Sequence, residues 1–374
     1  HECSSAASDV YKRQYVRSQI VQSVADAVDG LTPATLSVAE IDISTYSDDK
    51  GTRNLVYDHR DPKIIDRFIK TAWLKDEAGS TIATVVNFGN HPEALGSNNT
   101  LVTSDYVDAT RRGIEEGIAY PDGTIEGVGG VCVYMSGSVG GMMSPLRIEV
   151  TDGTGESYSD ASFEKSDAIG NVMAELVLQS LQSPAEIDSP ELALRARTFQ
   201  LPIDNVAFQA AFLLGMFDRP VYGVDTADLS FDDDNIPMLL TEVDLFDLGP
   251  IRMLSIPGEL LPELAIGGYD ESEGQPFTPL ETLINPDNEN PPDLSAAPEG
   301  PYLFDRMGGE YNWIIGLGND EVGYIIPPYN YQLHETTPYL QEADGDHYEE
   351  TNSLGPQTTP LIEEAVIELL EWSP

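Results

Sequence analysis

Basic residues are scarce in this sequence. Nineteen lysines and arginines stand against 64 aspartates and glutamates, which gives a formal net charge of -45. A charge of this sign repels nucleic acids and anionic membrane surfaces, so neither is expected as a partner. Long hydrophobic runs are also missing: no apolar stretch approaches the ~18 residues that a membrane-spanning helix needs, and we expect no transmembrane segment. The acidic residues are spread along the whole chain, which suits a halophilic protein that stays hydrated in high salt.

Cysteine is nearly absent as well. The two cysteines, Cys3 and Cys132, provide neither a disulfide framework nor a cysteine-type zinc site. Cys132 lies in an apolar run and is interpreted as a small buried hydrophobic residue. Hydrophobic residues still make up 41% of the 374 residues, which is enough for a substantial core. This length allows one large domain or two ordinary ones.

The first fourteen residues differ from the rest of the chain. Residues 9–14, DVYKRQ, match the translation of a transposon end used in preparing sequencing libraries. Residues 1–14 also lack a signal-peptide pattern and any hydrophobic periodicity. We therefore interpret residues 1–14 as an artefact outside the fold, and we expect the natural N-terminus to be missing.

From Tyr15 onward, hydrophobic periodicity predicts alternating helices and strands. Helices are predicted at 15–30, 104–117 (with Ser104 as N-cap), 161–181, 208–217 and 359–372. Strands are predicted at 38–43, 64–74, 81–88, 130–135, 192–201, 239–246, 251–256, 313–317 and 322–326, with two large hairpins at 64–88 and 239–256. Residues 267–300, rich in Pro, Asn, Asp and Glu, predict a long acidic surface excursion. Without internal repeats, these elements favour one α/β domain over residues 15–374, with a mixed sheet, flanking helices and β-hairpins.

Three polar side chains each follow a short apolar strand and lie beside Gly or Pro. They are His91, Glu259 and Tyr324. A histidine, a carboxylate and a phenol that converge from strand ends suit Zn²⁺, which keeps one position open for water when it is catalytic. Other interpretations stay open at this point. His91 and Tyr324 are also compatible with structural roles in the core, and Glu259 with the start of a helix.

A loop of small residues at 136–145 is the fourth candidate. Small residues let backbone N–H groups approach a substrate oxygen, which makes Gly140 and Gly141 candidate substrate-binding residues. The Ser144 hydroxyl is a candidate for orienting water or a leaving group. The loop contains no Gly-x-x-x-x-Gly-Lys-Ser/Thr and no Gly-x-Ser-x-Gly, so a nucleotide P-loop is excluded and the nucleophile-elbow pattern is not matched. A purely structural tight turn remains the alternative.

In chain order, these segments resemble the neutral ceramidase family of zinc amidases. The matching segments are 86–92 with 95–96, 104–106, 137–145, 256–259, 316–319 with 323–325, 348–350 and 355–358. Within them, Gly141-Met142-Met143-Ser144-Pro145 parallels the family's Gly-Asp-Val-Ser-Pro, with Met142 at the place of the aspartate. The resemblance covers most of residues 15–374 and implies a ceramidase-like catalytic domain.

The resemblance also implies a chemistry. The family holds one zinc ion through two histidines, a glutamate and a tyrosine, and hydrolyses the amide of ceramide with a metal-activated water. Carried over, His91 is the second histidine, Glu259 the glutamate and Tyr324 the tyrosine, whose phenol also steadies the oxyanion. Glu321 stands where the family often has a further tyrosine, so the choice between these two positions stays open. Ser144 is then a supporting catalytic residue and His347 a pocket residue.

Two family features are not found in this sequence. The family's first zinc ligand lies in a His-Thr-His-Ser segment upstream of the helix that begins at Tyr15, and the family carries a C-terminal immunoglobulin-like domain. We therefore expect this chain to supply at most three of four zinc ligands, to bind zinc weakly or not at all, and to have little activity. The resemblance favours a secreted protein with a lipid-like small-molecule substrate. The alternatives are a non-catalytic ligand- or partner-binding protein, and an ester or peptide hydrolase with the same metal centre.

Overall fold

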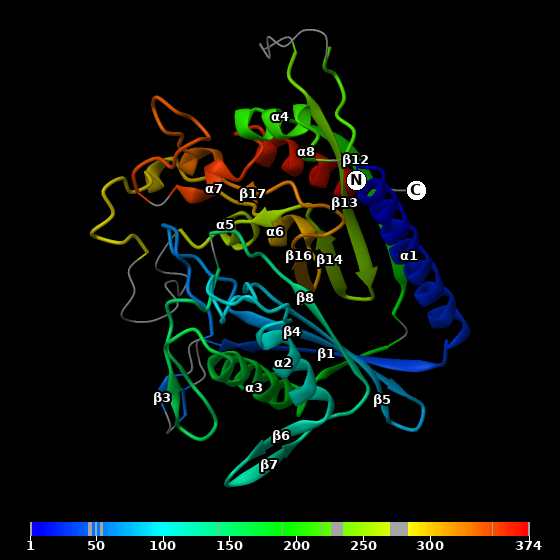
Figure 1. Ribbon diagram of the computed structural model, residues 1–374. Coiled ribbons are helices and arrows are strands. Elements are labelled where there is room, and N and C mark those ends of the chain that lie inside the picture. The colour runs from blue at the N-terminus through cyan, green and yellow to red at the C-terminus, as the bar shows by residue number, and fades with distance from the viewer. Residues whose placement is uncertain are drawn as a thin grey trace.

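A computed structural model describes residues 2–43, 47–48, 51–52, 55–141, 143–188, 190–217, 219–225, 235–269, 283–345 and 347–372. Figure 1 shows two layered halves, each built on a twisted sheet, with helices packed against the sheets. The earlier part of the chain forms the lower half and the later part the upper half, except that the first helix, residues 2–29, runs beside the upper half. The α/β class predicted from the sequence is confirmed, with several sheets in place of one.

The helices and the strands of the two larger sheets are interspersed along the chain. The helices are α1 (Glu2–Asp29), α2 (Tyr106–Glu115), α3 (Phe163–Ser180), α4 (Val206–Leu213), α5 (Pro262–Ile266), α6 (Leu303–Met307), α7 (Tyr348–Thr351) and α8 (Thr358–Glu371), with 3-10 turns η3 (Leu294–Ala296) and η4 (Pro328–Asn330). The strands of the larger sheets are β1 (Ala34–Asp42), β4 (Phe68–Asp76), β5 (Thr81–Phe88), β8 (Val131–Ser136), β11 (Ala185–Ile187), β12 (Leu192–Pro202), β13 (Met238–Leu248), β14 (Ile251–Ser255) and β16 (Tyr311–Ile315). Short pairs complete the set: β2 (Ser47–Asp48) with β3 (Gly51–Thr52), β6 (Gly117–Tyr120) with β7 (Gly123–Glu126), β9 (Val150–Thr151) with β10 (Ser157–Tyr158), and β15 (Glu259–Leu260) with β17 (Tyr324–Ile325).

The first sheet has the strand order β11-β1-β4-β5-β8. Its pairs are antiparallel except β5 and β8, which run parallel. Parallel neighbours need a crossover connection, and α2 lies in that connection. Helices α2 and α3 pack against each other and bury their apolar faces in the core of this half.

The second sheet has the strand order β12-β13-β14-β16, with β14 and β16 parallel. Helix α8 packs on β12 and β13 and closes the core of this half. The two sheets meet through a third apolar cluster, which includes Val38 and Ala72 from the first sheet and Trp313 from the second. The Asn87 side chain also crosses between the sheets and donates a hydrogen bond to the carbonyl of Ile314 at 2.9 Å. This joint fixes β5, and therefore His91, relative to the second half.

Most predicted elements are found within a few residues of their predicted ends, but several findings differ, including short elements that were not predicted (β2, β3, β9, β10, β11, α5, α6 and α7). Helix α1 continues back to Glu2, through the segment set aside as an artefact, and its described side chains from Tyr11 onward are exposed. The N-cap of α2 is Asp105 and not Ser104, because the Asp105 carboxylate accepts the N–H of Tyr106 at 2.7 Å. The hairpin of β6 and β7 was not predicted.

The acidic excursion predicted at 267–300 falls partly outside the described residues, which omit 270–282. Its later part follows turns and the short η3. Among the helices that the structure describes, none combines the length and the apolar character that crossing a membrane requires.

Candidate functional site

The His91 side chain reaches the site from the end of β5. The strand ends at Phe88, and the backbone N–H of His91 then donates to the carbonyl of Met143 at 2.8 Å. This hydrogen bond ties His91 to the loop of small residues at 136–145. The Nε2 atom of His91 lies 2.9 Å from the Oε2 atom of Glu259. Two residues on different halves of the molecule are thereby brought together.

Glu259 lies opposite Tyr324 in the parallel pair β15–β17. Its backbone N–H donates to the carbonyl of Gly323 at 3.0 Å, and both Glu259 and Tyr324 line the same cavity. Glu259 does not begin a helix, since α5 begins only at Pro262. The three side chains predicted as metal ligands therefore meet, with Glu259 between His91 and Tyr324.

Charge and burial shift the pKa values at this site. Burial lowers the pKa of His91, but the nearby carboxylate of Glu259 outweighs this effect, so the pKa is raised. Burial raises the pKa of the Tyr324 phenol well above its usual range, and the charge of Glu259 adds to this. Burial likewise raises the pKa of Glu321 to about 7, although the N–H of Gly323 opposes the shift. Neighbouring carboxylates in a partly buried place favour a cation.

The contact between His91 and Glu259 is short without being aligned as a hydrogen bond. Oε2 of Glu259 is buried, and it has no hydrogen-bond partner among the residues that the structure describes. Tetrahedral ligand atoms at about 2.0–2.2 Å from one zinc ion lie about 3.3–3.6 Å apart. The separation of 2.9 Å between His91 and Glu259 is therefore somewhat shorter than a shared zinc ion requires, and the two side chains would move apart slightly to hold one.

The donor atoms of this site come from three different kinds of side chain. Counting His, Cys, Asp and Glu alone, no group of three is gathered for a metal ion among the described residues. The third donor of this set is a phenol, that of Tyr324. An imidazole nitrogen, a carboxylate oxygen and a phenol oxygen fit the nitrogen and oxygen ligands that zinc takes.

The loop of small residues packs directly on β15. The N–H of Gly140 donates to the carbonyl of Leu260 at 2.9 Å, and a Cβ atom on Gly140 would lie 2.5 Å from the backbone nitrogen of Leu261. Gly141 has φ +74°, a conformation that glycine adopts without strain. The Ser144 hydroxyl is buried and accepts the N–H of Leu146 at 3.1 Å. Ser144 therefore shapes the turn that supports His91.

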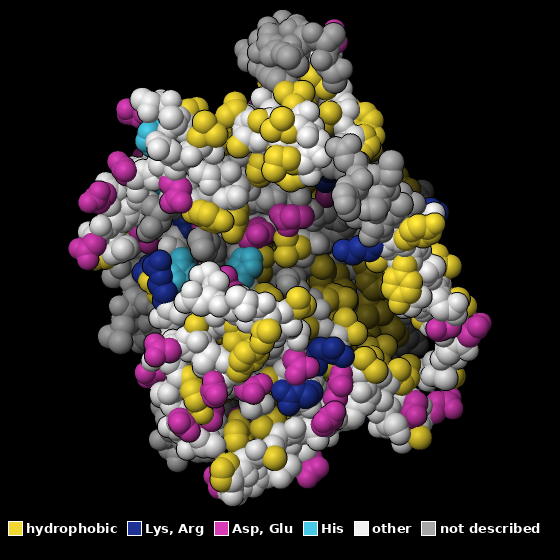
Figure 2. All heavy atoms as spheres, viewed as in Figure 1, with side chains coloured by type: hydrophobic (Ala, Val, Ile, Leu, Met, Phe, Trp, Pro, Cys, Tyr) yellow, Lys and Arg dark blue, Asp and Glu magenta, His cyan; other side chains and the backbone are white. Residues whose placement is uncertain are grey.

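A cavity of about 370 Å³ opens beside Glu259 and Tyr324. One end is polar, with Glu259, Glu321 and Tyr324, and the opposite wall is mainly apolar. The other lining residues are Phe208, Phe212, Phe217, Arg219, Leu239, Val322, Gly323, Tyr348, Asn352 and Leu354. Figure 2 shows acidic side chains and a histidine in the hollowed centre of this face, below hydrophobic side chains that cover α4. An apolar cavity with a few convergent polar groups is typical of a small-molecule site.

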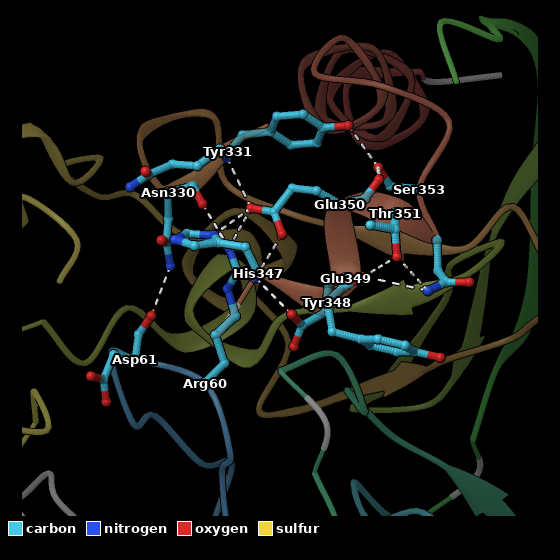
Figure 3. Close-up of polar contacts among 12 residues, drawn as sticks. Arg60, Asp61, Asn330, Tyr331, His347, Tyr348, Glu349, Glu350, Thr351 and Ser353 are labelled. Atoms are coloured by element: carbon cyan, nitrogen blue, oxygen red, sulfur yellow. Dashed lines mark hydrogen bonds and ion pairs between the residues drawn. The ribbon is translucent and has the colours of Figure 1, made fainter. Parts of the chain in front are cut away.

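His347 belongs to a different set of contacts, which Figure 3 shows. Its Nδ1 atom lies 2.8 Å from Oε1 of Glu350, and its side chain is buried. The buried guanidinium of Arg60 is the centre of this network: it pairs with Glu349 at 2.7 Å and Glu350 at 2.8 Å and donates to the carbonyl of Asn330 at 2.6 Å. The network joins the segment before β4 to α7 and η4.

The electrostatics of the network follow from burial and pairing. Burial alone raises the pKa of Glu350, but the hydrogen bond from His347 and the charge of Arg60 outweigh it and hold the pKa at about 2. The two carboxylates in turn raise the pKa of Arg60 above its ordinary value, against the effect of burial. Tyr348, which is next to His347 in the sequence, lines the cavity, whereas His347 does not.

Sequence reasoning missed Arg60 and the aromatic wall of α4. The signal for Arg60 was the acidic pair Glu349-Glu350 inside a segment matched by the family resemblance, since two buried acids need a cation. The signal for the wall was the run at 206–217, which contains three phenylalanines and no charge.

The fold and the site together define a mixed α/β protein with a cavity that combines acidic side chains with a mainly apolar wall. No family model and no curated protein matches the chain by sequence. Among solved structures, the neutral ceramidase from Pseudomonas aeruginosa is similar in fold, with a TM-score of 0.57 and 14% identity over 94% of this chain and 54% of that one. A ceramidase complexed with C2 gives a TM-score of 0.54 and 13% identity over 91% of this chain and 53% of that one. The chain has a ceramidase-like fold and spans about half the length of those structures.

Proposed function

We propose that this protein is a zinc-dependent hydrolase that cleaves the amide of an N-acylated lipid. One observation carries the proposal: Glu259 lies 2.9 Å from His91 and opposite Tyr324, and Glu259 and Tyr324 line a cavity whose other wall is mainly apolar. The ceramidase-like fold supports the same substrate class. This support comes from similarity of fold alone, because the sequence identity is 14%.

In the proposed function, His91, Glu259 and Tyr324 hold the metal. When bound, zinc supplies a Lewis acid that polarises a carbonyl oxygen and lowers the pKa of water. Tyr324 is the phenol of the set because it lies in register with Glu259. Glu321 adds a carboxylate to the same end of the cavity and is not needed as the tyrosine substitute.

The remaining residues position the substrate. Phe208, Phe212 and Leu354 offer an apolar wall for an acyl chain, which also keeps water from the polar end. The loop of small residues brings its backbone against β15, and Ser144 fixes the turn behind His91. In the proposal, Ser144 is a supporting residue and not a nucleophile, because its hydroxyl is buried in that turn.

The test is the release of fatty acid from N-acyl ethanolamines whose acyl groups run from acetyl to palmitoyl. Protein is kept in excess over substrate, with zinc added. We expect hydrolysis to increase with chain length and to fall about a hundredfold or more in Glu259→Gln, while Glu299→Gln, an exposed acid outside the cavity, behaves as the parent. Binding without hydrolysis would favour the ligand-binding alternative. Faster cleavage of the matching esters would favour the esterase alternative.

A further inference from the structure

The segment that begins with α4 exposes large apolar side chains. Residues 206–217 contain no charged residue, in a chain with a net charge of -45. Five of their side chains form what we call the α4 patch, and they are exposed as follows: Val206 44%, Leu213 49%, Leu214 76%, Met216 72% and Phe217 41%. Figure 2 shows hydrophobic side chains gathered at this place. Exposed apolar clusters of this kind usually mark a surface that meets another apolar body.

The α4 patch is continuous with the cavity. Phe208 and Phe212 lie on the inner side of α4 and line the cavity, and Phe217 belongs both to the patch and to the cavity wall. The ring of Phe217 packs edge-on against Phe208 at 5.8 Å and Phe212 at 5.1 Å. An apolar path therefore runs from the exposed patch into the space beside Glu259.

We propose that the α4 patch docks on an uncharged or zwitterionic lipid surface, from which the acyl chain of the substrate enters the cavity. This inference rests on the proposed function. A lipid surface presents acyl chains at the place where the apolar path begins. A protein partner at this place would cover the cavity mouth and present no acyl chains. A second copy of the chain in this position would close the mouth.

The charges exclude an anionic lipid surface as the preferred one. The chain carries 64 acidic and 19 basic residues, so anionic headgroups repel it. Arg219, the basic residue beside the patch, is held by Asp320 through hydrogen bonds of 2.7 and 2.8 Å. Docking then depends on buried apolar area, as it does for amphipathic helices that lie in a membrane interface.

Co-sedimentation with phosphatidylcholine vesicles tests the docking. The variant is Leu214→Ser/Met216→Ser, at two exposed positions that do not line the cavity. The matched control is Leu192→Ser/Leu194→Ser on β12, where both leucines are 68% exposed. We expect the parent and the control to bind alike and the α4 variant to bind about tenfold more weakly. Mixing phosphatidylglycerol into the vesicles should weaken binding by the parent.

Several outcomes would overturn the inference. The first two are no vesicle binding by the parent and an equal loss of binding in the α4 variant and the control variant. The third is stronger binding to vesicles that contain phosphatidylglycerol. The fourth is self-association of the parent without vesicles, if the α4 variant alone loses this self-association. A second readout separates docking from the proposed function. Hydrolysis of a short-chain amide dissolved as monomers should be the same in the parent and the α4 variant, while hydrolysis of amides embedded in vesicles should fall in the variant. Vesicle binding without any hydrolysis would leave the docking intact and reject the proposed function.

Discussion

Glu259 and Tyr324 lie directly opposite each other in the two-residue parallel pair β15–β17, and both line the same cavity. Each comes from a segment that leaves the second sheet, after β14 and after β16. Since β14 and β16 are themselves parallel neighbours, their continuations stay adjacent and form this pair. The second sheet therefore places two of the proposed metal ligands, Glu259 and Tyr324, side by side, and His91 approaches Glu259 from the first sheet.

Replacing Gly140 with alanine should displace β15. The added Cβ atom would lie 2.5 Å from the backbone nitrogen of Leu261, and backbone does not yield as a flexible side chain does. We expect a loss of about 1–3 kcal/mol in the free energy of unfolding, measured by chemical denaturation. The control is Gly123→Ala, since nothing lies within 4 Å of a Cβ atom at Gly123. Equal stability of the two variants would show that the loop does not press on β15.

Removing the charge of Arg60 should be far more costly than removing an exposed one. Arg60→Met leaves Glu349 and Glu350 buried without their cation, which costs about 3–5 kcal/mol in stability. Arg112→Met removes an exposed pair with Asp108 and should cost less than about 1 kcal/mol. Denaturant midpoints of the two variants give the comparison. A loss for Arg60→Met no larger than that of Arg112→Met contradicts the account of the network.

The carboxyl of Glu263 in α5 should make stability fall as pH rises. Burial raises its pKa from 4.5 to about 7, and Oε1 has no hydrogen-bond partner among the described residues. Between pH 4.5 and about 7 the unfolded chain releases this proton while the folded chain keeps it, so the contribution is present at low pH and lost toward neutrality. This difference in pKa between the folded and the unfolded chain corresponds to at most about 3 kcal/mol in the free energy of unfolding.

Glu263→Gln isolates that carboxyl. The variant should match the parent below pH 4.5 and exceed it in unfolding free energy above about pH 7, by an amount that grows across the interval. Thermal melts at several pH values measure this. If the difference between the two proteins is the same at every pH, Glu263 does not titrate in the folded protein as described.

Much of the fold could be predicted from local patterns. Strand β5 was predicted with its observed ends, and α3 and α8 within two residues, because each carries a strong hydrophobic period and clear stop signals. The N-cap of α2 was misplaced by one residue because Ser104 and Asp105 are both good caps. The choice depends on tertiary contacts, since the Asp105 carboxylate also accepts the N–H groups of Ala94 and Leu95.

The site could be predicted only in part. His91, Glu259 and Tyr324 were recognised as strand-end residues in a family order, but their meeting depends on the parallel pairing of β14 with β16, which a local pattern does not encode. Arg60 was invisible for the same reason, since its partners lie almost 300 positions away in the chain. Their assignment as zinc ligands stays a prediction.

Titration of Zn²⁺ into the chain by calorimetry tests the central claim most directly. His91→Ala and Glu259→Gln remove proposed ligands, and His334→Ala is the control, because His334 hydrogen-bonds Thr337 outside the cavity. We predict one zinc ion per chain, with an affinity that falls at least about tenfold in each ligand variant and is unchanged in the control. Absence of zinc binding by the parent, or equal affinity in the parent and in His91→Ala, would contradict the claim.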